Sequence, residues 1–401
     1  MSDCDRDACT VDTRTTIYDQ RFTVTFHYPV VFTRALFRPD NPALLEAVRR
    51  LEPDRRHRLI VFLDDGVLAA RPRLAEEIAD YARAHARHLE LVAPPLPVPG
   101  GERIKNELFF VEHIMAKLHE YHLDRQSFVM AVGGGAVLDA VGLVAATTHR
   151  GIRLLRVPTT VLAQNDSGVG VKNGVNLFGC KNFVGTFAPP FAVLNDLDFI
   201  ELLPPREKIA GMAEAVKVAL IRDAAFFTWL ERHADALALF ERPAMATMIR
   251  RCAELHMRQI AQGGDPFETG SARPLDFGHW AAHRLETMTR HHLRHGEAVA
   301  IGIALDSRYS VTAGLLEAGA EERICALLEH LGFRLWHPAL LARDGQGRLQ
   351  LLAGLAEFRE HLGGELTITL LEAIGRGIEV HAMDEDGIAR AIAWLEARQK
   401  G

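Results

Sequence analysis

The stretch Ser127-Phe128-Val129-Met130-Ala131-Val132-Gly133-Gly134-Gly135-Ala136-Val137-Leu138-Asp139 decides the fold of this chain. Its first six residues form an apolar run with the length of a buried strand, and the three glycines lead into a helical pattern. A strand that ends in glycines and opens a helix lets backbone N–H groups approach a pyrophosphate, helped by the positive end of the helix dipole. The spacing departs from the strict G-x-G-x-x-G pattern, so a tight turn without a ligand stays open as the alternative reading.

Strands and helices alternate on both sides of this turn. We expect strands at 21–34, 58–63, 89–93, 127–132 and 153–157, and helices at 42–51, 73–88, 105–120 and 137–148. This alternation is typical of a parallel sheet covered by helices. After about residue 197 helical periodicity dominates, at 206–221, 224–233, 243–261, 275–289, 296–313, 319–331, 351–360 and 384–398. The sequence therefore predicts an α/β domain at 1–197 and a mostly α-helical domain at 198–401, while residues 1–15 are expected to be disordered.

Length and composition narrow the class of protein. A chain of 401 residues is too long for a typical single core, which agrees with two domains. The net charge of -6 argues against nucleic-acid binding, and no stretch approaches the roughly 18 apolar residues that a membrane span needs. The first residues, 1–7, are acidic and polar, unlike a signal peptide. Five cysteines, an odd number, predict reduced thiols in a cytoplasmic protein.

A carboxylate and several histidines have the pattern of a metal site. Glu214 lies within a predicted helix, His279 and His283 are four residues apart and project from one helix face, and His295 opens the next helical segment. One glutamate and two histidines that leave a coordination position open are the usual ligands of catalytic zinc. His283 is either a further ligand or a proton carrier, and a solvated patch of histidines remains the alternative reading.

Polar and charged side chains near glycines and turns suggest an anionic substrate. Lysine and arginine side chains bind phosphate groups well. The candidate substrate-binding residues are Arg150, Lys172, Lys181, the amide residue Asn182, Lys217 and Arg273. Asp64 ends an earlier strand, where its carboxylate can bind a ribose or an adenine, and Glu102 and Lys105 can do likewise. Each of these residues taken singly can also be a surface charge.

Together these segments resemble the dehydroquinate synthase superfamily, the sugar phosphate cyclases, over roughly residues 58–375. The resemblance rests on VGGGAVLDAVG (132–142), HRGIRLLRVPTTVLAQNDSGVGVKNGVN (149–176), KNFVGTF (181–187), GMAEAVKVALI (211–221), RPLDFGHWAAHRLE (273–286) and HGEAVAIG (295–302). It implies a Rossmann-like domain followed by a helical domain, usually in a homodimer. It also implies a carbon–oxygen lyase acting on phosphates, with NAD and Zn²⁺ or Co²⁺ as cofactors and a small sugar phosphate as substrate.

The resemblance assigns a role to each matching position. The implied metal ligands are Glu214, His279 and His295. The implied NAD contacts are Asp64, Glu102, Lys105, Gly134, Gly135, Asp139, Thr159 and Thr160. The implied substrate site contains Asp166, Lys172, Lys181, Asn182, Lys217, Arg273 and His283, and Arg150 would reach the active site of the partner subunit.

The implied reaction has no net redox change. Bound NAD⁺ takes a hydride from a secondary alcohol, and the new ketone acidifies the adjacent C–H because the metal and nearby cations stabilise the enolate. Phosphate is then eliminated, the hydride returns, the ring opens, and an intramolecular aldol reaction closes a carbocycle.

Two positions depart from the classical dehydroquinate synthase pattern. Asp276 replaces an asparagine at the start of the metal helix, and His361 stands near the place of a lysine. An added carboxylate would repel a substrate carboxylate by several kcal/mol at about 4 Å and moderate dielectric, whereas a hydroxymethyl group can donate to it. With Asp276 and His361 at these two positions, the sequence resembles the sedoheptulose 7-phosphate cyclases, which make epi-valiolone-type C7 cyclitols. The segment VGVKNGVN (169–176) is similar to the corresponding segment of a branch of this superfamily found in gene clusters named ebo.

Other activities stay open at this stage. Arg273 and Arg258, the latter standing near a second missing lysine, can serve a substrate carboxylate, which would make the protein an ordinary 3-dehydroquinate synthase. Metal-dependent alcohol and glycerol dehydrogenases share the fold by resemblance, but they do not need the phosphate-binding set. A metabolite-binding protein without catalysis is the third alternative.

Overall fold

The computed structural model describes residues 17–269, 275–361 and 365–400. The strands and helices up to residue 196 are β1 (Val30–Thr33), α1 (Ala43–Arg49), β2 (His57–Asp64), α2 (Asp65–Ala70), α3 (Leu74–Ala84), β3 (Leu89–Leu91), β4 (Leu96–Val98), α4 (Arg103–Asn106), α5 (Leu108–Glu120), β5 (Phe128–Gly133), α6 (Gly135–Thr147), β6 (Arg153–Pro158), β7 (Lys172–Leu177), β8 (Cys180–Phe187) and β9 (Ala192–Asp196). A short 3-10 helix, η1 (Thr148–Arg150), and a short π-helix, η2 (Ala163–Ser167), lie among them.

The remainder is mostly helical. Its elements are α7 (Pro205–Arg222), α8 (Ala224–Arg232), α9 (Ala234–Ala238), α10 (Arg242–Gln262), α11 (His279–Met288), α12 (His295–Thr312), α13 (Ala320–His330), α14 (Ala353–His361), β10 (Ile368–Ala373), β11 (Arg376–Val380) and α15 (Glu385–Lys400). Short turns η3 (Leu197–Leu202), η4 (Pro338–Leu341) and η5 (Gln350–Leu352) connect them. We propose a domain boundary at 197/198, between β9 and α7.

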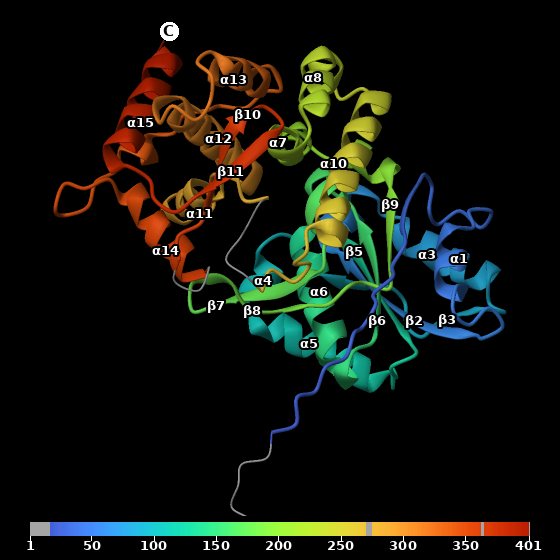
Figure 1. Cartoon of the computed structure of the whole chain (residues 1–401). Coiled ribbons are helices and arrows are strands. Elements are labelled where there is room, and N and C mark those ends of the chain that lie inside the picture. Colours follow the sequence, from blue (N-terminus) through green and yellow to red (C-terminus); the bar gives the residue numbers. More distant parts are fainter. Residues whose placement is uncertain (1–16, 270–274, 362–364, 401) are drawn as a thin grey trace, which may run out of the picture.

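A seven-stranded parallel sheet forms the centre of the α/β part. Its order is β1-β9-β6-β5-β2-β3, and β4 pairs with β2. Alternate residues of β2 point to opposite faces, so that Leu59 and Val61 pack with α1 and α3, while Ile60 and Phe62 pack with α5 and α6 (Figure 1). Burial on both faces explains why the strands are continuous apolar runs. The predicted helix-covered parallel sheet is confirmed.

The ends of three neighbouring strands place the glycine turn. Leu63 of β2 pairs with Val132 of β5, and Gly133 pairs with Pro158 of β6. Because these strands are parallel, their carboxyl ends meet at one edge of the sheet, where open α/β folds bind ligands. The glycine turn, the end of β2 and the start of the segment after β6 therefore lie side by side.

The helical part surrounds its own apolar core. Helices α7 and α12 run through this core and are buried along most of their lengths, and the other helices pack around them (Figure 1). An antiparallel hairpin, β10–β11, lies beside α7 and α12. Among the described helices, none is long and apolar enough to span a membrane.

Several expected elements differ in extent. The strand expected at 21–34 covers only Val30–Thr33, the helix expected at 105–120 is divided into α4 and α5, and the helix expected from residue 275 begins at His279. Four strand segments were missed: β4, the β7–β8 hairpin, β9, and the β10–β11 hairpin. Most of β8 is exposed and so lacks an alternating apolar pattern, and β10–β11 depends on packing against helices distant in sequence. The segment expected to be disordered, residues 1–15, lies outside the described residues.

Candidate active site

The predicted metal ligands come together from three helices. Glu214 lies within α7, and His279 and His295 are the first residues of α11 and α12. Glu214 Oε1 is 3.8 Å from His279 Nε2 and 3.5 Å from His295 Nε2, and one potential ligand atom of each residue lies within 4.8 Å of the others. Residues distant in sequence thus form one compact cluster of the type predicted.

Two glycines allow the helices to approach this closely. A Cβ on Gly296 would lie 1.9 Å from the Ala210 carbonyl oxygen, so the start of α12 packs directly on the backbone of α7. Gly278 precedes α11 with a φ of 78°, a left-handed conformation that favours glycine. These contacts bring the two histidines to the glutamate.

The charges and free oxygen atoms of the cluster suit a divalent cation. Glu214 is buried, and its Oε1 accepts no hydrogen bond from any described residue, while Lys217 pairs with Oε2. Burial alone would raise the pKa of Glu214, but Lys217 and His295 hold it well below its usual value. An ionised, unpartnered carboxylate oxygen beside two imidazoles is a donor set that fits Zn²⁺.

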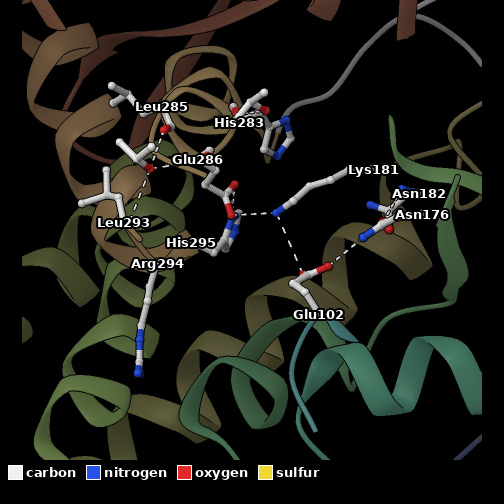
Figure 2. Close-up of polar contacts among 12 residues, drawn as sticks. Glu102, Asn176, Lys181, Asn182, His283, Leu285, Glu286, Leu293, Arg294 and His295 are labelled. Carbon is white, nitrogen blue, oxygen red and sulfur yellow. Dashed lines mark hydrogen bonds and ion pairs between the residues drawn. The ribbon is translucent and has the colours of Figure 1, made fainter. Parts of the chain in front are cut away.

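Glu286 is a site residue that sequence reasoning missed. Its Oε2 lies 3.2 Å from His295 Nδ1, and its Oε1 accepts a 2.7 Å hydrogen bond from Lys181 Nζ (Figure 2). Burial lowers the pKa of His295, but the carboxylates of Glu286 and Glu214 raise it to about 10. Glu286 follows His279 by seven residues and His283 by three, so helical spacing is the sequence signal that could have identified it.

Asp166 is paired with a second residue that was missed. In η2, Asp166 Oδ1 lies 2.8 Å from Nδ1 of His256, a residue of α10. Burial raises the pKa of Asp166, but the attraction of His256 and Lys217 brings it below its usual value. Arg258, one of two arginines considered for a substrate carboxylate, is exposed, pairs with Glu254 at 2.5 Å and lines a surface cavity of about 420 Å³.

The β7–β8 hairpin carries three predicted substrate residues toward the helices. Lys181 bridges Glu286 and, at 4.0 Å, Glu102 of the turn before α4 (Figure 2). Lys172 is exposed and pairs with Glu268 at 2.6 Å. Asn182 is also exposed, and its Oδ1 accepts a 2.5 Å hydrogen bond from Lys105. The hairpin thus lies between the predicted cofactor residues and the metal cluster.

Asp276 and His283 lie near the metal-binding histidines. Asp276 is half-buried just before α11; burial raises its pKa, but the attraction of His279 and Lys172 brings it below its usual value. Burial lowers the pKa of Lys217, but the carboxylates of Glu214, Asp166 and Asp276 raise it above its usual value. The His283 ring is exposed, 5.4 Å from the His279 ring and 6.0 Å from the His295 ring.

The predicted cofactor residues gather at the edge of the sheet. Gly134 and Gly135 begin α6, and Asp64, at the end of β2, accepts hydrogen bonds from the Gly66 and Val67 amides. Lys105 donates to Asp139 at 2.8 Å, and Glu102 accepts from Asn176. After β6, Thr159 is buried with no partner for its hydroxyl among the described residues, and the Thr160 hydroxyl accepts from the Ala163 amide.

For three predicted site residues the described part of the chain shows no contact with this arrangement. Arg150 is exposed beyond the end of α6, about 20 Å along that helix from the glycine turn. Arg273 lies outside the described residues, and so does the side chain of His361, which is the last residue of α14. Their contacts therefore stay predictions.

Comparisons with known proteins agree with this architecture. Residues 95–210 match the family described as 3-dehydroquinate synthase N-terminal, and residues 211–350 match 3-dehydroquinate synthase C-terminal. The chain is 40% identical over 289 residues to the 3-dehydroquinate synthase of Dichelobacter nodosus, covering 68% of this chain and 77% of the relative. It is 38% identical to that of Halorhodospira halophila, covering 79% of this chain and 91% of the relative.

The chain therefore belongs to the 3-dehydroquinate synthase family, a family of sugar phosphate cyclases and thus of lyases. Among solved structures it resembles the 2-epi-5-epi-valiolone synthase of Streptomyces hygroscopicus, which contains bound NAD⁺ and Zn²⁺. That likeness has a TM-score of 0.83 and 28% identity, and it covers 95% of this chain and 100% of the other.

Proposed function

We propose that this protein is a sugar phosphate cyclase that converts sedoheptulose 7-phosphate to an epi-valiolone-type C7 cyclitol. The observation that carries the proposal is the half-buried Asp276, held ionised beside the metal cluster. With Asp166 and Glu214 it places three carboxylates around Lys217. A substrate carboxylate about 4 Å from Asp276 would be repelled by up to about 4 kcal/mol at an effective dielectric of about 20. A hydroxymethyl group would instead donate a hydrogen bond.

The proposed cofactors are NAD and Zn²⁺, as in the related epi-valiolone synthase. When bound, they would supply a transient oxidation of a secondary alcohol and the polarisation of the resulting ketone. Glu214, His279 and His295 would hold the metal, and the amides of Gly134 and Gly135 would face the pyrophosphate at the positive end of α6.

The remaining residues would bind and orient the sugar phosphate. Lys181 and Asn182 lie at the turn end of the β7–β8 hairpin and Lys172 at its other end, and these polar groups would suit a phosphate group. Lys217 donates a fixed positive charge next to the metal position, where negative charge develops on the substrate. His283, exposed beside both metal-binding histidines, is positioned to carry a proton.

The proposed functional unit is a homodimer. Arg150 lies too far along α6 to serve the active site of its own chain, and it is exposed. His149 and Arg150 both have positive φ values, 52° and 63°, a costly backbone conformation for residues other than glycine. This exposure agrees with the proposal that Arg150 reaches the phosphate of the partner subunit.

An ordinary 3-dehydroquinate synthase is the second candidate, because the two curated relatives carry that name. Its substrate needs a cation for the carboxylate. Arg258, one of the two arginines considered for this task, faces a different surface. Arg273, the other arginine considered, lies outside the described residues, so its part in this alternative stays a prediction.

Phosphate release is the experiment that tests the proposed activity. Purified protein with Zn²⁺, NAD⁺ and sedoheptulose 7-phosphate should release phosphate without net accumulation of NADH. Glu214→Gln should abolish the release, whereas Glu321→Gln, which alters a buried ion pair in α13, should not. Stoichiometric NADH without phosphate would indicate a dehydrogenase. Absence of both products from this substrate would contradict the proposal.

A further inference from the structure

Asp306 is a buried carboxylate of α12 that has no part in the site described above. Its side chain is inaccessible to solvent, and it lies within the apolar core of the helical part. Its Oδ2 accepts a 3.1 Å hydrogen bond from the Gly278 amide, and its Oδ1 accepts a 3.0 Å hydrogen bond from Trp280 Nε1. The two donors flank His279 in the chain.

One peptide group connects Asp306 to the imidazole of His279. The Gly278 N–H and the Phe277 carbonyl belong to the same peptide, and this carbonyl lies 3.1 Å from His279 Nδ1. The contact fits the tautomer that carries its proton on Nδ1, which leaves the Nε2 lone pair facing Glu214. A carboxylate on the N–H side polarises the peptide and strengthens its carbonyl as an acceptor.

This peptide also has little freedom to move. A Cβ on Gly302 of α12 would lie 2.0 Å from the Gly278 carbonyl oxygen, and a Cβ on Gly278 would lie 2.7 Å from the Ile303 amide nitrogen. The backbone before His279 is therefore pressed against α12. Asp306 fixes the orientation of a peptide whose position is already set by packing.

Packing alone does not account for a carboxylate at this place. A buried charge is costly unless it is paired, and no lysine, arginine or histidine of the described residues forms an ion pair with Asp306. An apolar side chain would fill the same volume but would leave the Gly278 amide and the Trp280 indole N–H without this acceptor. The two hydrogen bonds, both to groups that flank a metal ligand, give the carboxylate a specific task.

We propose that Asp306 is a positioning residue for the metal site, acting on His279 through the Phe277–Gly278 peptide. A carbonyl that accepts from the other ring nitrogen of a ligating histidine fixes its ring orientation and tautomer, and it raises the basicity of the ring. The inference deepens the proposed function because it uses the same metal ligands. It depends on cation binding and not on the identity of the sugar phosphate.

The test is the affinity for Zn²⁺, measured by competition with a chelator at about pH 8. Asp306→Asn retains the shape of the side chain, but it offers one acceptor oxygen to two donors, the Gly278 amide and Trp280 Nε1. Loss of Zn²⁺ affinity by about 10- to 100-fold is expected, with a changed visible spectrum of the Co²⁺-loaded protein. Trp280→Phe is the matched control, since it removes the other donor from the same buried carboxylate and leaves the Gly278 contact.

The comparison between the two variants decides the proposal. Trp280→Phe should lower the melting temperature as much as Asp306→Asn does, but its Zn²⁺ affinity should stay within about threefold of wild type. Equal loss of affinity in both variants, or wild-type affinity in Asp306→Asn, would overturn the proposal. If Asp306→Asn does not fold, Asp306→Ser provides the same comparison with a shorter side chain. Failure of sedoheptulose 7-phosphate as substrate would leave this result unaffected.

Discussion

Replacing Glu286 by glutamine should weaken the metal site without touching a ligand. In the native protein one carboxylate serves two partners, Lys181 Nζ at 2.7 Å and His295 Nδ1 at 3.2 Å. A glutamine side chain has the same shape, but its single oxygen accepts from only one of them, and its amide group opposes the other. The substitution therefore leaves one buried contact unmade in either orientation.

The expected magnitude follows from the geometry. Two unit charges about 3 Å apart attract by about 5 kcal/mol at an effective dielectric of about 20, which is an upper bound. Lys181 keeps 27% of its side-chain surface exposed, so solvent screens part of this attraction. We expect a net loss of about 1–3 kcal/mol at the metal site, or about 10- to 100-fold in Zn²⁺ affinity.

Competition with a chelator measures this loss. Glu321→Gln is the matched control, because Glu321 is a similarly buried glutamate that accepts from Arg308 and from the Gly319 amide, both remote from the cluster in the chain. Its Zn²⁺ affinity should remain that of wild type. If Glu286→Gln binds Zn²⁺ within about threefold of wild type, the role assigned to Glu286 is wrong.

Three further predictions test other parts of the account. Asp276→Asn should change the ratio of the kcat/KM values for the C7 keto-acid phosphate and sedoheptulose 7-phosphate by at least about tenfold in favour of the keto acid, because it removes a charge that repels a carboxylate. An unchanged ratio in steady-state kinetics would argue against that role. Arg150→Ala and Glu214→Gln subunits should each be inactive, but mixing them after dissociation should restore about a quarter of wild-type activity if each dimer forms at random, whereas no recovery would argue against action across the dimer. Burial raises the pKa of Asp306 to about 7, above its value of about 3.9 in an unfolded chain, so folding favours its protonated form. Metal-free protein should therefore lose stability, by up to about 4 kcal/mol, as pH rises from about 4 to about 7, and denaturant titration should show a flatter profile for Asp306→Asn.

The sequence predicted those features that depend on local pattern. The run before Gly133 and the periodicity of α7, α10 and α12 predicted the parallel sheet and the helical part, because strand length and helical spacing are local properties. The cluster of Glu214 and two histidines followed from helical spacing and from the resemblance to a family. In these places local preference and tertiary packing favour the same structure.

Contacts between distant segments were not predictable in the same way. His256 faces Asp166 across 90 residues of sequence, and nothing in its own helix distinguishes it from Arg258, which points to a different surface. The β7–β8 hairpin was missed because its exposed second strand has no apolar alternation. In the sequence nothing distinguishes Asp306 from other polar residues of its helix. Only the structure shows that it accepts from the Gly278 amide and Trp280 Nε1.

The central claim concerns the substrate, and a direct comparison of two substrates tests it. Phosphate release by wild-type protein with Zn²⁺ and NAD⁺ would be measured with sedoheptulose 7-phosphate and, in parallel, with the C7 keto-acid phosphate used by 3-dehydroquinate synthases. The account predicts release from sedoheptulose 7-phosphate, with a kcat/KM at least about a hundredfold higher than for the keto acid, as a repulsion of about 3 kcal/mol or more implies. Release from the keto-acid phosphate alone would contradict it and identify a 3-dehydroquinate synthase with an altered pocket.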